Sequence, residues 1–380
     1  MRGLLGLVAA VVLVDTAFFA ILSPLLPGYA AALGLSKSAV GVLVGAFAAG
    51  VLVAALPSGL LPSRLGLRPT LLLGLGLTAV SSVLFGLGDR FRLLVLTRFA
   101  AGIGSACSWT ASVGWLARTA PRDRRGELIG FAISAAVAGA FLGPLLGAAA
   151  AWIGTGPAFG TVAGACVALA ARVAVLREPG AEPRGVTMIA ALALRTLWVP
   201  LGLILLAPLL FAVLGVLVPL ALGAQGWDAG WLGALSAAAA ALEAGVHPLL
   251  GRWADRQGAL APISAGLAGA IAVLVALAVA RHPWLVAGLF VAAAITFGAT
   301  LVPGMALLTR AADAAGLGSV LAIALANLAW ALGHAVGSPL CGWLADRAGD
   351  TVTYLAFAAL CLAVLAALHS DLKVVERGDA

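Results

Sequence analysis

Stretches of about twenty apolar residues follow one another along nearly the whole chain, and no other feature limits its possible folds so strongly. One helix of roughly 20 apolar residues crosses the hydrocarbon core of a bilayer. Twelve such segments are present, at about 4–26, 38–60, 69–88, 91–116, 127–150, 157–176, 196–222, 229–250, 259–280, 283–308, 318–342 and 351–370. We therefore predict an all-α integral membrane protein with twelve transmembrane helices.

The composition fits a bilayer better than water as the surrounding solvent. Of 380 residues, 63% are hydrophobic and 10% are charged, whereas about a quarter of an ordinary soluble domain is charged. The net charge of +7 is spread over short loops without a basic face, so we expect no nucleic-acid partner. The cysteines stand alone, without metal-ligand spacing, at 107, 166, 341 and 361, so we expect no metal and no cofactor.

Basic residues predict the orientation of the chain in the membrane. The first segment follows Arg2 as a signal peptide would, but it is as long as a full span and carries Asp15 at its middle, so we expect it to be retained. With the N-terminus inside, the outside loops hold only Lys37, Arg90, Arg92, Arg281 and Arg347, and every other Lys or Arg except Arg98 falls inside. Such a bias predicts a plasma (inner) membrane protein with both termini in the cytoplasm.

The two halves of the chain repeat one another at an offset of 192 residues. Pro27 matches Pro219, and Arg118 matches Arg310. An offset that spans six helices keeps the same membrane orientation, which predicts two parallel six-helix repeats. We place an N-terminal bundle at 1–176, a polar, Pro-rich cytoplasmic linker at 177–195 and a C-terminal bundle at 196–380.

A charged motif occurs at corresponding places in the two halves. It reads GRWADRQG at 251–258 and, in a fainter copy, GLLPSRLG at 59–66. We interpret both copies as cytoplasmic turns, the first between the eighth and ninth helices and the second between the second and third, in which glycine permits a tight turn. The candidate gating residues of these turns are Gly59, Arg64, Gly66, Gly251, Asp255, Arg256 and Gly258.

Several motifs, in the expected order, resemble those of the major facilitator superfamily. GRWADRQG resembles that family's loop motif, although Ser63 replaces the acid in the first copy, and that acid helps to latch the two halves in the family. LTRFAAGIG at 96–104 is similar to the motif of the family's fourth helix, and PRDRRGELIG at 121–130 to the loop that follows it. VDTAFFAILSPLLP at 14–27 resembles the first-helix signature of the drug:proton antiporter branch. The resemblance implies a cavity lined by the first, fourth, seventh and tenth helices.

GAFLGPLLG at 139–147 resembles the family's antiporter motif of the fifth helix, with Gly139, Gly143, Pro144 and Gly147 as its candidate residues. The resemblance implies a role in preventing leak of the solute. Close packing of a small-residue helix face is sufficient to explain the same residues. Glu127 begins this helix beside Arg124, where we expect it to stabilise the positive end of the helix dipole.

Ionisable residues inside predicted spans are costly and suggest function. The proton-coupling candidates are Asp15, Arg98, Glu243 and His247. Asp15 could carry protons as water reaches it from alternate sides, or it could form a fixed salt bridge with Arg98. Glu243 and His247 share a helix face at i, i+4 and could relay a proton, or they could satisfy each other locally.

A second set of residues could contact a solute. Asn327, Trp330 and His334 form one stripe of the eleventh predicted helix, and Trp109 shares a face with Arg98 on the fourth. This stripe could instead supply hydrogen bonds and packing between helices.

These observations favour a secondary transporter that exports a small organic or drug-like solute in exchange for protons. Its partners would be the solute, protons and the lipid bilayer, and we expect a monomer. A proton symporter or uniporter of a sugar, amino acid or small metabolite is the alternative within transport. A receptor or scaffold that transports nothing is the alternative outside it. An enzyme is not expected, because the chain has no phosphate-binding loop, nucleophile elbow or zinc motif.

Overall fold

The computed structural model describes residues 2–121, 124–176, 178, 191–317 and 319–378, and all regular structure in these ranges is helical. The predicted linker at 177–195 lies mostly outside them. The helices are α1 (Arg2–Ala20), η1 (Ser23–Leu25), α2 (Leu26–Leu33), α3 (Lys37–Arg64), α4 (Leu67–Leu87), α5 (Phe91–Thr119), α6 (Arg125–Ile153), α7 (Thr155–Ala174), η2 (Arg195–Leu197), α9 (Trp198–Ala224), α10 (Ala229–Gln257), α11 (Leu260–Val279), α12 (Pro283–Ala314) and α13 (Ser319–Gly378).

Eleven helical segments of the described chain are long and apolar enough to cross a membrane. The sequence predicts twelve, and α13 accounts for the difference. Gly349 interrupts this helix with φ 86°, so α13 consists of two helices joined at a sharp bend. A glycine adopts this φ without the steric penalty that other residues pay. The predicted segments 318–342 and 351–370 lie on either side of the bend.

The two copies of the charged motif are mostly helical, which corrects their interpretation as turns. Residues 251–257 form the last turns of α10, and residues 59–64 form those of α3. In the copy at 251–258 only Gly258 lies beyond the helix, with φ 82°, and in the copy at 59–66 Leu65 and Gly66 do, with φ 100° at Gly66. The arginines and Asp255 therefore stand on the helix ends. Each turn has two residues, 65–66 between α3 and α4 and 258–259 between α10 and α11.

The first predicted span is interrupted near its end. The sequence predicts one helix over 4–26, but α1 ends at Ala20 and a 3-10 turn precedes α2. Pro24 lacks the N–H that would bond to the Ala20 carbonyl, so the α-helical hydrogen-bond pattern cannot continue. This break lies beside the central cavity described below.

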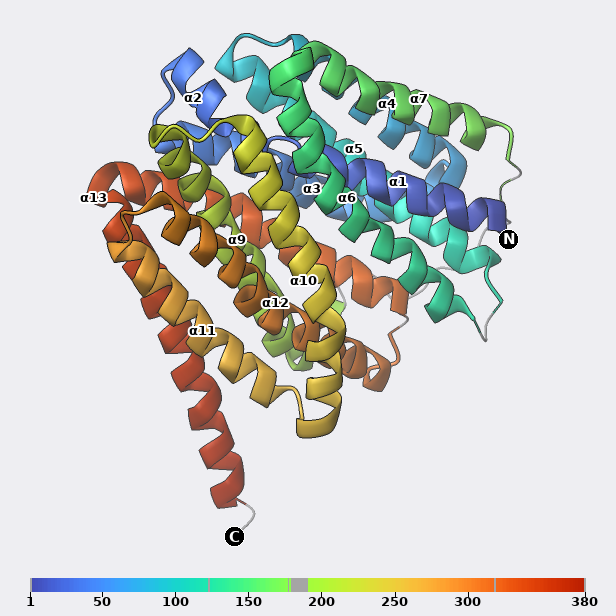
Figure 1. The fold of residues 1–380 in the computed structure, drawn as a ribbon. Coiled ribbons are helices and arrows are strands. Elements are labelled where there is room, and N and C mark those ends of the chain that lie inside the picture. The colour runs from blue at the N-terminus through green and yellow to red at the C-terminus, as the bar shows by residue number, and fades with distance from the viewer. Residues whose placement is uncertain (1, 122–123, 177, 179–190, 318, 379–380) are drawn as a thin grey trace.

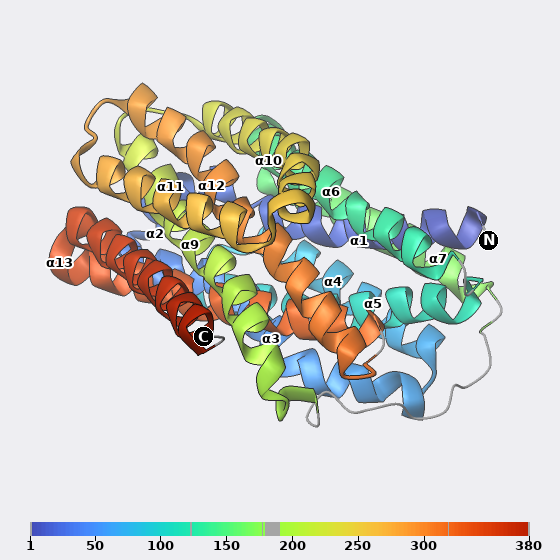
Figure 2. The ribbon, with the colours of Figure 1, turned by 90° about the horizontal axis from the view of Figure 1, so that it is seen from below.

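The helices form two groups, α1–α7 and α9–α13 (Figure 1). Helices α3 and α13 make the most extensive contact between the groups, and α6 and α10 make a second one. The groups meet near α2 and the Gly349 bend, which we name the distal end, and they diverge toward the two chain termini, which we name the terminal end (Figures 1 and 2).

Small residues allow the closest helix contacts. Gly139 and Gly143 of α6 pack against the α1 backbone at Leu13 and Ala17, and Gly147 packs against the backbone of Ile21 just after α1. A Cβ at Gly143 would lie 2.6 Å from the Ala17 carbonyl oxygen, so the backbones can approach only because glycine is present. The antiporter-like motif therefore has a packing function in this structure.

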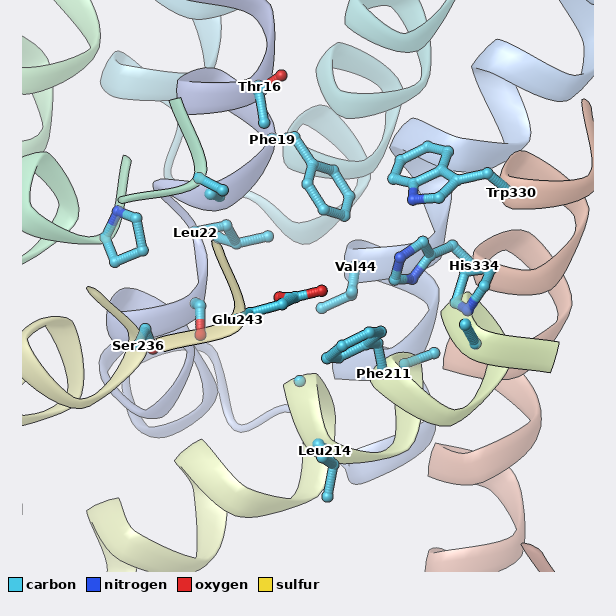
Figure 3. A pocket seen from close by; sticks show the side chains of 18 of the residues that line it. Thr16, Phe19, Leu22, Val44, Phe211, Leu214, Ser236, Glu243, Trp330 and His334 are labelled. Atoms are coloured by element: carbon cyan, nitrogen blue, oxygen red, sulfur yellow. The ribbon is translucent and has the colours of Figure 1, made fainter. Parts of the chain in front are cut away.

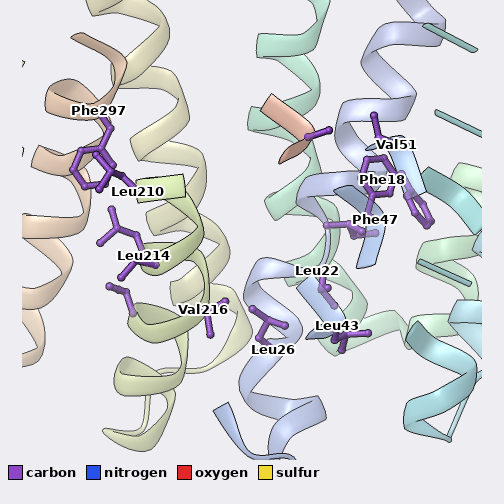
Figure 4. Close-up of a cluster of buried hydrophobic side chains, with 14 of the residues drawn as sticks. Phe18, Leu22, Leu26, Leu43, Phe47, Val51, Leu210, Leu214, Val216 and Phe297 are labelled. Atoms are coloured by element: carbon purple, nitrogen blue, oxygen red, sulfur yellow. The ribbon is translucent and has the colours of Figure 1, made fainter. Parts of the chain in front are cut away.

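One buried hydrophobic cluster extends through both groups and joins them (Figure 4). Phe18, Phe47 and Leu22 belong to the first group, and Leu214 and Phe297 to the second. Large apolar side chains are also exposed on the outside of the bundle, including Val53 at 61% and Leu87 at 73%. Such a surface suits contact with lipid tails.

Candidate functional site

A cavity of about 320 Å³ lies between the two helix groups. This volume is within the range of sites that hold small organic ligands. The lining residues come from α1, η1, α2, α3, α5, α6, α9, α10, α12 and α13, so the lining involves more helices than the four that the family resemblance implies. The apolar and aromatic part of the lining includes Phe19, Leu22, Val44, Phe211, Leu214, Phe290, Leu301 and Trp330.

Glu243 of α10 is the acidic side chain in this lining (Figure 3). Its carboxylate extends into the cavity between Leu22 and Phe211, and its side chain is 23% exposed. A smaller extension of the cavity, of about 120 Å³, continues past Glu243 beside Ser236 and Phe290. A negative charge in a mostly apolar cavity would attract a cation.

His247 lies one helical turn from Glu243, as the i, i+4 spacing predicts. Its Nε2 is 3.3 Å from Glu243 Oε1. This approach lacks hydrogen-bond geometry, and Nε2 is buried without a hydrogen-bond partner among the described residues. Gly298 of α12 makes room for the pair, because a Cβ there would lie 2.9 Å from Nε2 and 3.6 Å from Oε1.

Asp15 of α1 is buried, and it is not among the residues that line the cavity. Two side chains of α5 hold its carboxylate. Ser105 Oγ donates a hydrogen bond to Asp15 Oδ2 at 2.8 Å, and Trp109 Nε1 donates one to the same oxygen at 2.7 Å. Trp109, predicted as a cavity residue, is therefore engaged with Asp15 and is also absent from the lining. Ser105 and Trp109 follow Arg98 by seven and eleven residues on the same face of the helix. This spacing did not predict that they would bind Asp15.

Arg98 of α5 is 1% exposed and binds backbone rather than a carboxylate. Its Nη1 donates to the Phe18 carbonyl at 3.0 Å, and its Nη2 donates to the Phe19 carbonyl at 3.3 Å. These carbonyls lie in the last turn of α1, where the helix breaks and leaves acceptors without intrahelical donors. The ion pairs of the described chain do not include Asp15 with Arg98. Arg98 thus stabilises the break in the first span.

The guanidinium of Arg98 also stacks on aromatic rings. Its central carbon lies 5.1 Å from the Phe47 ring centroid and 5.8 Å from that of Phe19. Cation–π contact of this kind favours arginine in an otherwise apolar setting. Arg98 itself lines the cavity, and it also fixes the backbone and the ring of Phe19, another residue of the cavity wall.

An aromatic cluster in the cavity joins the two groups. The Phe19 ring of α1 lies 5.1 Å from Trp330 and 5.3 Å from His334, both on α13. Trp330 and His334 are 4.7 Å apart, and both line the cavity. Asn327, the third member of that stripe, is not in the lining. His334 is buried, and its Nδ1 has no hydrogen-bond partner among the described residues.

Sequence reasoning did not identify three phenylalanines of the cavity wall, Phe19, Phe211 and Phe290. Helices that are apolar on every side carry no periodicity that separates a lipid-facing phenylalanine from one facing a cavity. Ionisable and polar residues could be identified, because each is unusual in a span.

The structure thus defines a multi-helix membrane protein with a mostly apolar central cavity between two helix groups. Residues 8–334 match the family model described as Major Facilitator Superfamily. The chain therefore belongs to this superfamily, and it is a transporter rather than an enzyme.

Two curated relatives match part of the chain. The "Quinolone resistance protein NorA" of Staphylococcus aureus (strain MRSA252) is 31% identical over 124 residues, which are 33% of this chain and 32% of that protein. The "Multidrug resistance protein 2" of Bacillus subtilis (strain 168) is 28% identical over 156 residues, or 41% of this chain and 39% of that protein. The chain therefore spans less than half the length of either relative in these matches.

Solved structures match the fold over almost the full chain. A bacterial homologue of the human lysosomal transporter Spinster, in an inward-facing and unoccupied conformation, has a TM-score of 0.77 at 17% identity, covering 96% of this chain and 95% of that one. A D-xylose-proton symporter has a TM-score of 0.72 at 17% identity, covering 95% of both chains. At such identity the similarity concerns the fold.

Proposed function

We propose that this transporter exports a small organic solute, preferably a lipophilic cation, in exchange for protons by alternating access. Its cavity would open in turn to either side of the plasma membrane. The two relatives whose names refer to quinolone and multidrug resistance support the solute class. We keep the predicted division into bundles at 1–176 and 196–380, cytoplasmic termini and a monomer as parts of this proposal.

The position of Glu243 carries the proposal. Its carboxylate points into a cavity lined by aromatic and aliphatic side chains, including Phe19, Phe211 and Trp330 (Figure 3). A lipophilic cation is complementary to both features, because its apolar body can contact the rings and its charge can contact the carboxylate.

Exchange follows if a proton and a cation compete for the same carboxylate. Each neutralises the charge that Glu243 places in an apolar cavity, so binding of one removes the attraction for the other. His247, 3.3 Å away, could accept the proton that leaves Glu243 and pass it toward water. Coupling then requires only one further property. The protein with an empty cavity and a charged Glu243 must change conformation less readily than the protein in which a proton or a cation has neutralised this charge.

Asp15 would act differently from Glu243. Asp15 is buried behind the cavity wall, and its Oδ2 accepts the hydrogen bonds from both Ser105 and Trp109. A proton on Asp15 would change its contacts with Ser105 and Trp109, and would thereby alter how α1 packs on α5. We assign Asp15 a role in the conformational change and Glu243 the direct competition with solute.

Symport of a sugar is less compatible with the cavity, although the D-xylose-proton symporter has the same fold. A sugar needs many hydrogen-bond partners, since its hydroxyl groups lose water on binding. The lining offers few uncharged polar side chains, among them Thr16, Ser23 and Ser236. The receptor or scaffold alternative gives no reason for an acid in the cavity.

Proton flux in proteoliposomes tests the proposal. Purified protein is reconstituted with a pH-sensitive dye inside and challenged with tetraphenylphosphonium, ethidium and D-xylose in turn. Protons should move opposite to the cations, and Glu243→Gln should abolish this movement. Glu127→Gln is the matched control, because Glu127 is exposed at the start of α6 and pairs with Arg124 at 2.8 Å.

The direction of flux separates the alternatives. Protons that enter together with D-xylose would replace exchange by symport. Proton exchange that survives in Glu243→Gln would remove this residue from the coupling mechanism. No flux with any solute, from protein that remains folded, would contradict proton-coupled transport of these compounds.

A further inference from the structure

The loop motif occurs a third time, at the opposite end of the molecule. Residues 342–349 read GWLADRAG, and they share the glycines, alanine, aspartate and arginine of GRWADRQG at 251–258 in the same spacing. This copy lies at the bend in α13, at the distal end, whereas 251–258 end α10 at the terminal end (Figure 1).

The aspartate of the third copy binds the other helix group. Asp346 Oδ1 accepts a hydrogen bond from the Lys37 backbone N–H at 3.1 Å, and Asp346 Oδ2 accepts one from the Ser38 N–H at 2.8 Å. These N–H groups are in the first turn of α3, where they have no intrahelical acceptor. A carboxylate is also attracted to the positive end of the helix dipole. Asp346 therefore caps a helix more than 300 residues away along the chain.

An ion pair strengthens the same junction. Lys37 Nζ lies 2.5 Å from Asp350 Oδ1, and about a third of each side chain is exposed, at 36% and 34%. The backbones approach closely as well. Gly342 packs against the Lys37 carbonyl and Gly41 against the Ser338 carbonyl, so that a Cβ at either glycine would overlap the opposing backbone.

The acids of the motif differ between the two ends. In the first copy Ser63 replaces the acid, and in the second Asp255 lies 3.9 Å from Arg310, which belongs to the same helix group. Asp346 is the motif aspartate that bonds across the two groups in the described chain.

We propose that residues 342–350 of α13 form a distal latch on the first turn of α3, and that this latch makes the distally closed conformation the resting state. The proposal rests on the alternating access proposed above. The cavity can open at the distal end only if the two groups separate there, which breaks both bonds to Asp346 and the Lys37–Asp350 ion pair. At the other end Ser63 replaces the acid that would hold the groups together. The transporter would therefore rest with its cavity closed at the distal end, the side that the charge bias predicts to be extracellular.

Distances between two spin labels test the latch without any transport assay. Ala32 of α2 and Ala348 beside the bend are both exposed and belong to opposite groups. Labels at Ala32→Cys and Ala348→Cys report the distal opening in detergent, with neither solute nor a pH gradient. The four native cysteines are buried. Labelling the protein without the two added cysteines shows how far the native cysteines react with the spin label.

We expect one short distance to dominate in the otherwise unchanged protein. Asp346→Ala should raise the ratio of distally open to closed molecules about fivefold, as loss of a charged helix cap implies. Asp346→Asn should raise it less, because an amide oxygen still accepts a hydrogen bond. Asp255→Ala, at the same place in the second copy, should leave the distal distance unchanged.

A charge exchange separates a specific latch from general loosening. Lys37→Asp alone should open the distal end, and Lys37→Asp with Asp350→Lys should close it again. A distal distance that stays the same in folded Asp346→Ala protein would overturn the proposal, as would equal opening in Asp255→Ala. Because these distances require no transport, a failure of proton exchange would leave the test of the latch intact.

Discussion

At the scale of single residues, the contact between Glu243 and His247 depends on Gly298, which has no side chain. Gly298 leaves space for His247, whose Nε2 would lie 2.9 Å from a Cβ at that position. Gly298→Ala should therefore displace the imidazole from Glu243 and lower substrate-driven proton flux several-fold, if the relay through His247 operates. Gly288→Ala is the matched control on the same helix, because a Cβ there meets no atom within 4 Å. Equal flux in the two variants would contradict a role for the pair.

Trp330 offers a second test at this scale. Its indole lines the cavity and contacts the Phe19 ring at 5.1 Å. Loss of one aromatic contact to a desolvated cation costs about 2 kcal/mol, so Trp330→Ala should weaken binding of tetraphenylphosphonium by about thirtyfold. Trp152→Ala, which changes a tryptophan that is 85% exposed, should leave binding unchanged. Isothermal titration calorimetry on purified protein measures both affinities.

The pH dependence of binding follows from the same carboxylate. In the proposed exchange a proton and the cation compete for Glu243, so the affinity for the cation should fall as the pH falls. Competition by one proton lowers this affinity by at most about tenfold for each pH unit. Glu243→Gln should make affinity weak and nearly independent of pH. A pH dependence that persists in this variant would point to another group, such as Asp15.

At the scale of helices, the contact of α6 with α1 relies on glycine. Gly143 lies so close to Ala17 that any larger side chain must separate the helices. Gly143→Leu should destabilise the protein by about 1–3 kcal/mol, the usual range for overpacking. Gly130→Leu on the same helix is the control, because nothing lies within 4 Å of a Cβ there. Thermal unfolding in detergent should show a lower Tm for the first variant and little change for the second.

The sequence predicts helices better than the irregularities between them. Long apolar runs locate the spans, because the bilayer requires a minimum length, although α10 and α12 continue to Gln257 and Ala314, beyond the predicted ends at 250 and 308. The break after Ala20 was missed, although Pro24 carries its signal. The charged motif was taken for a turn because its polarity resembles that of loops, yet polar residues also occupy the ends of spans where these emerge from lipid.

The cavity was predictable only in part, for a related physical reason. Glu243, Trp330 and His334 could be identified because acids, tryptophan and histidine are uncommon in spans. Their partners come from helices distant in sequence, and single-helix periodicity does not say which helix faces which. The distal role of Asp346 was missed because the motif was sought only after the second and eighth helices.

At the scale of the whole molecule, the proposed mechanism requires the two helix groups to move relative to one another around one cavity. Glycine contacts and the α13–α3 junction hold the groups together at the distal end, and the groups diverge toward the termini (Figure 1). The central claim is that a proton and a solute cation exclude each other at Glu243, so that one of them must leave before the other binds.

Proton release on cation binding tests this claim most directly. Purified protein in weakly buffered detergent solution is mixed with saturating tetraphenylphosphonium at a series of decreasing pH values, and released protons are counted with a pH indicator. The account predicts about one proton per bound cation, as competition for one carboxyl requires, with none from Glu243→Gln and the full amount from Glu127→Gln. Cation binding that releases no proton from the unchanged protein would contradict it.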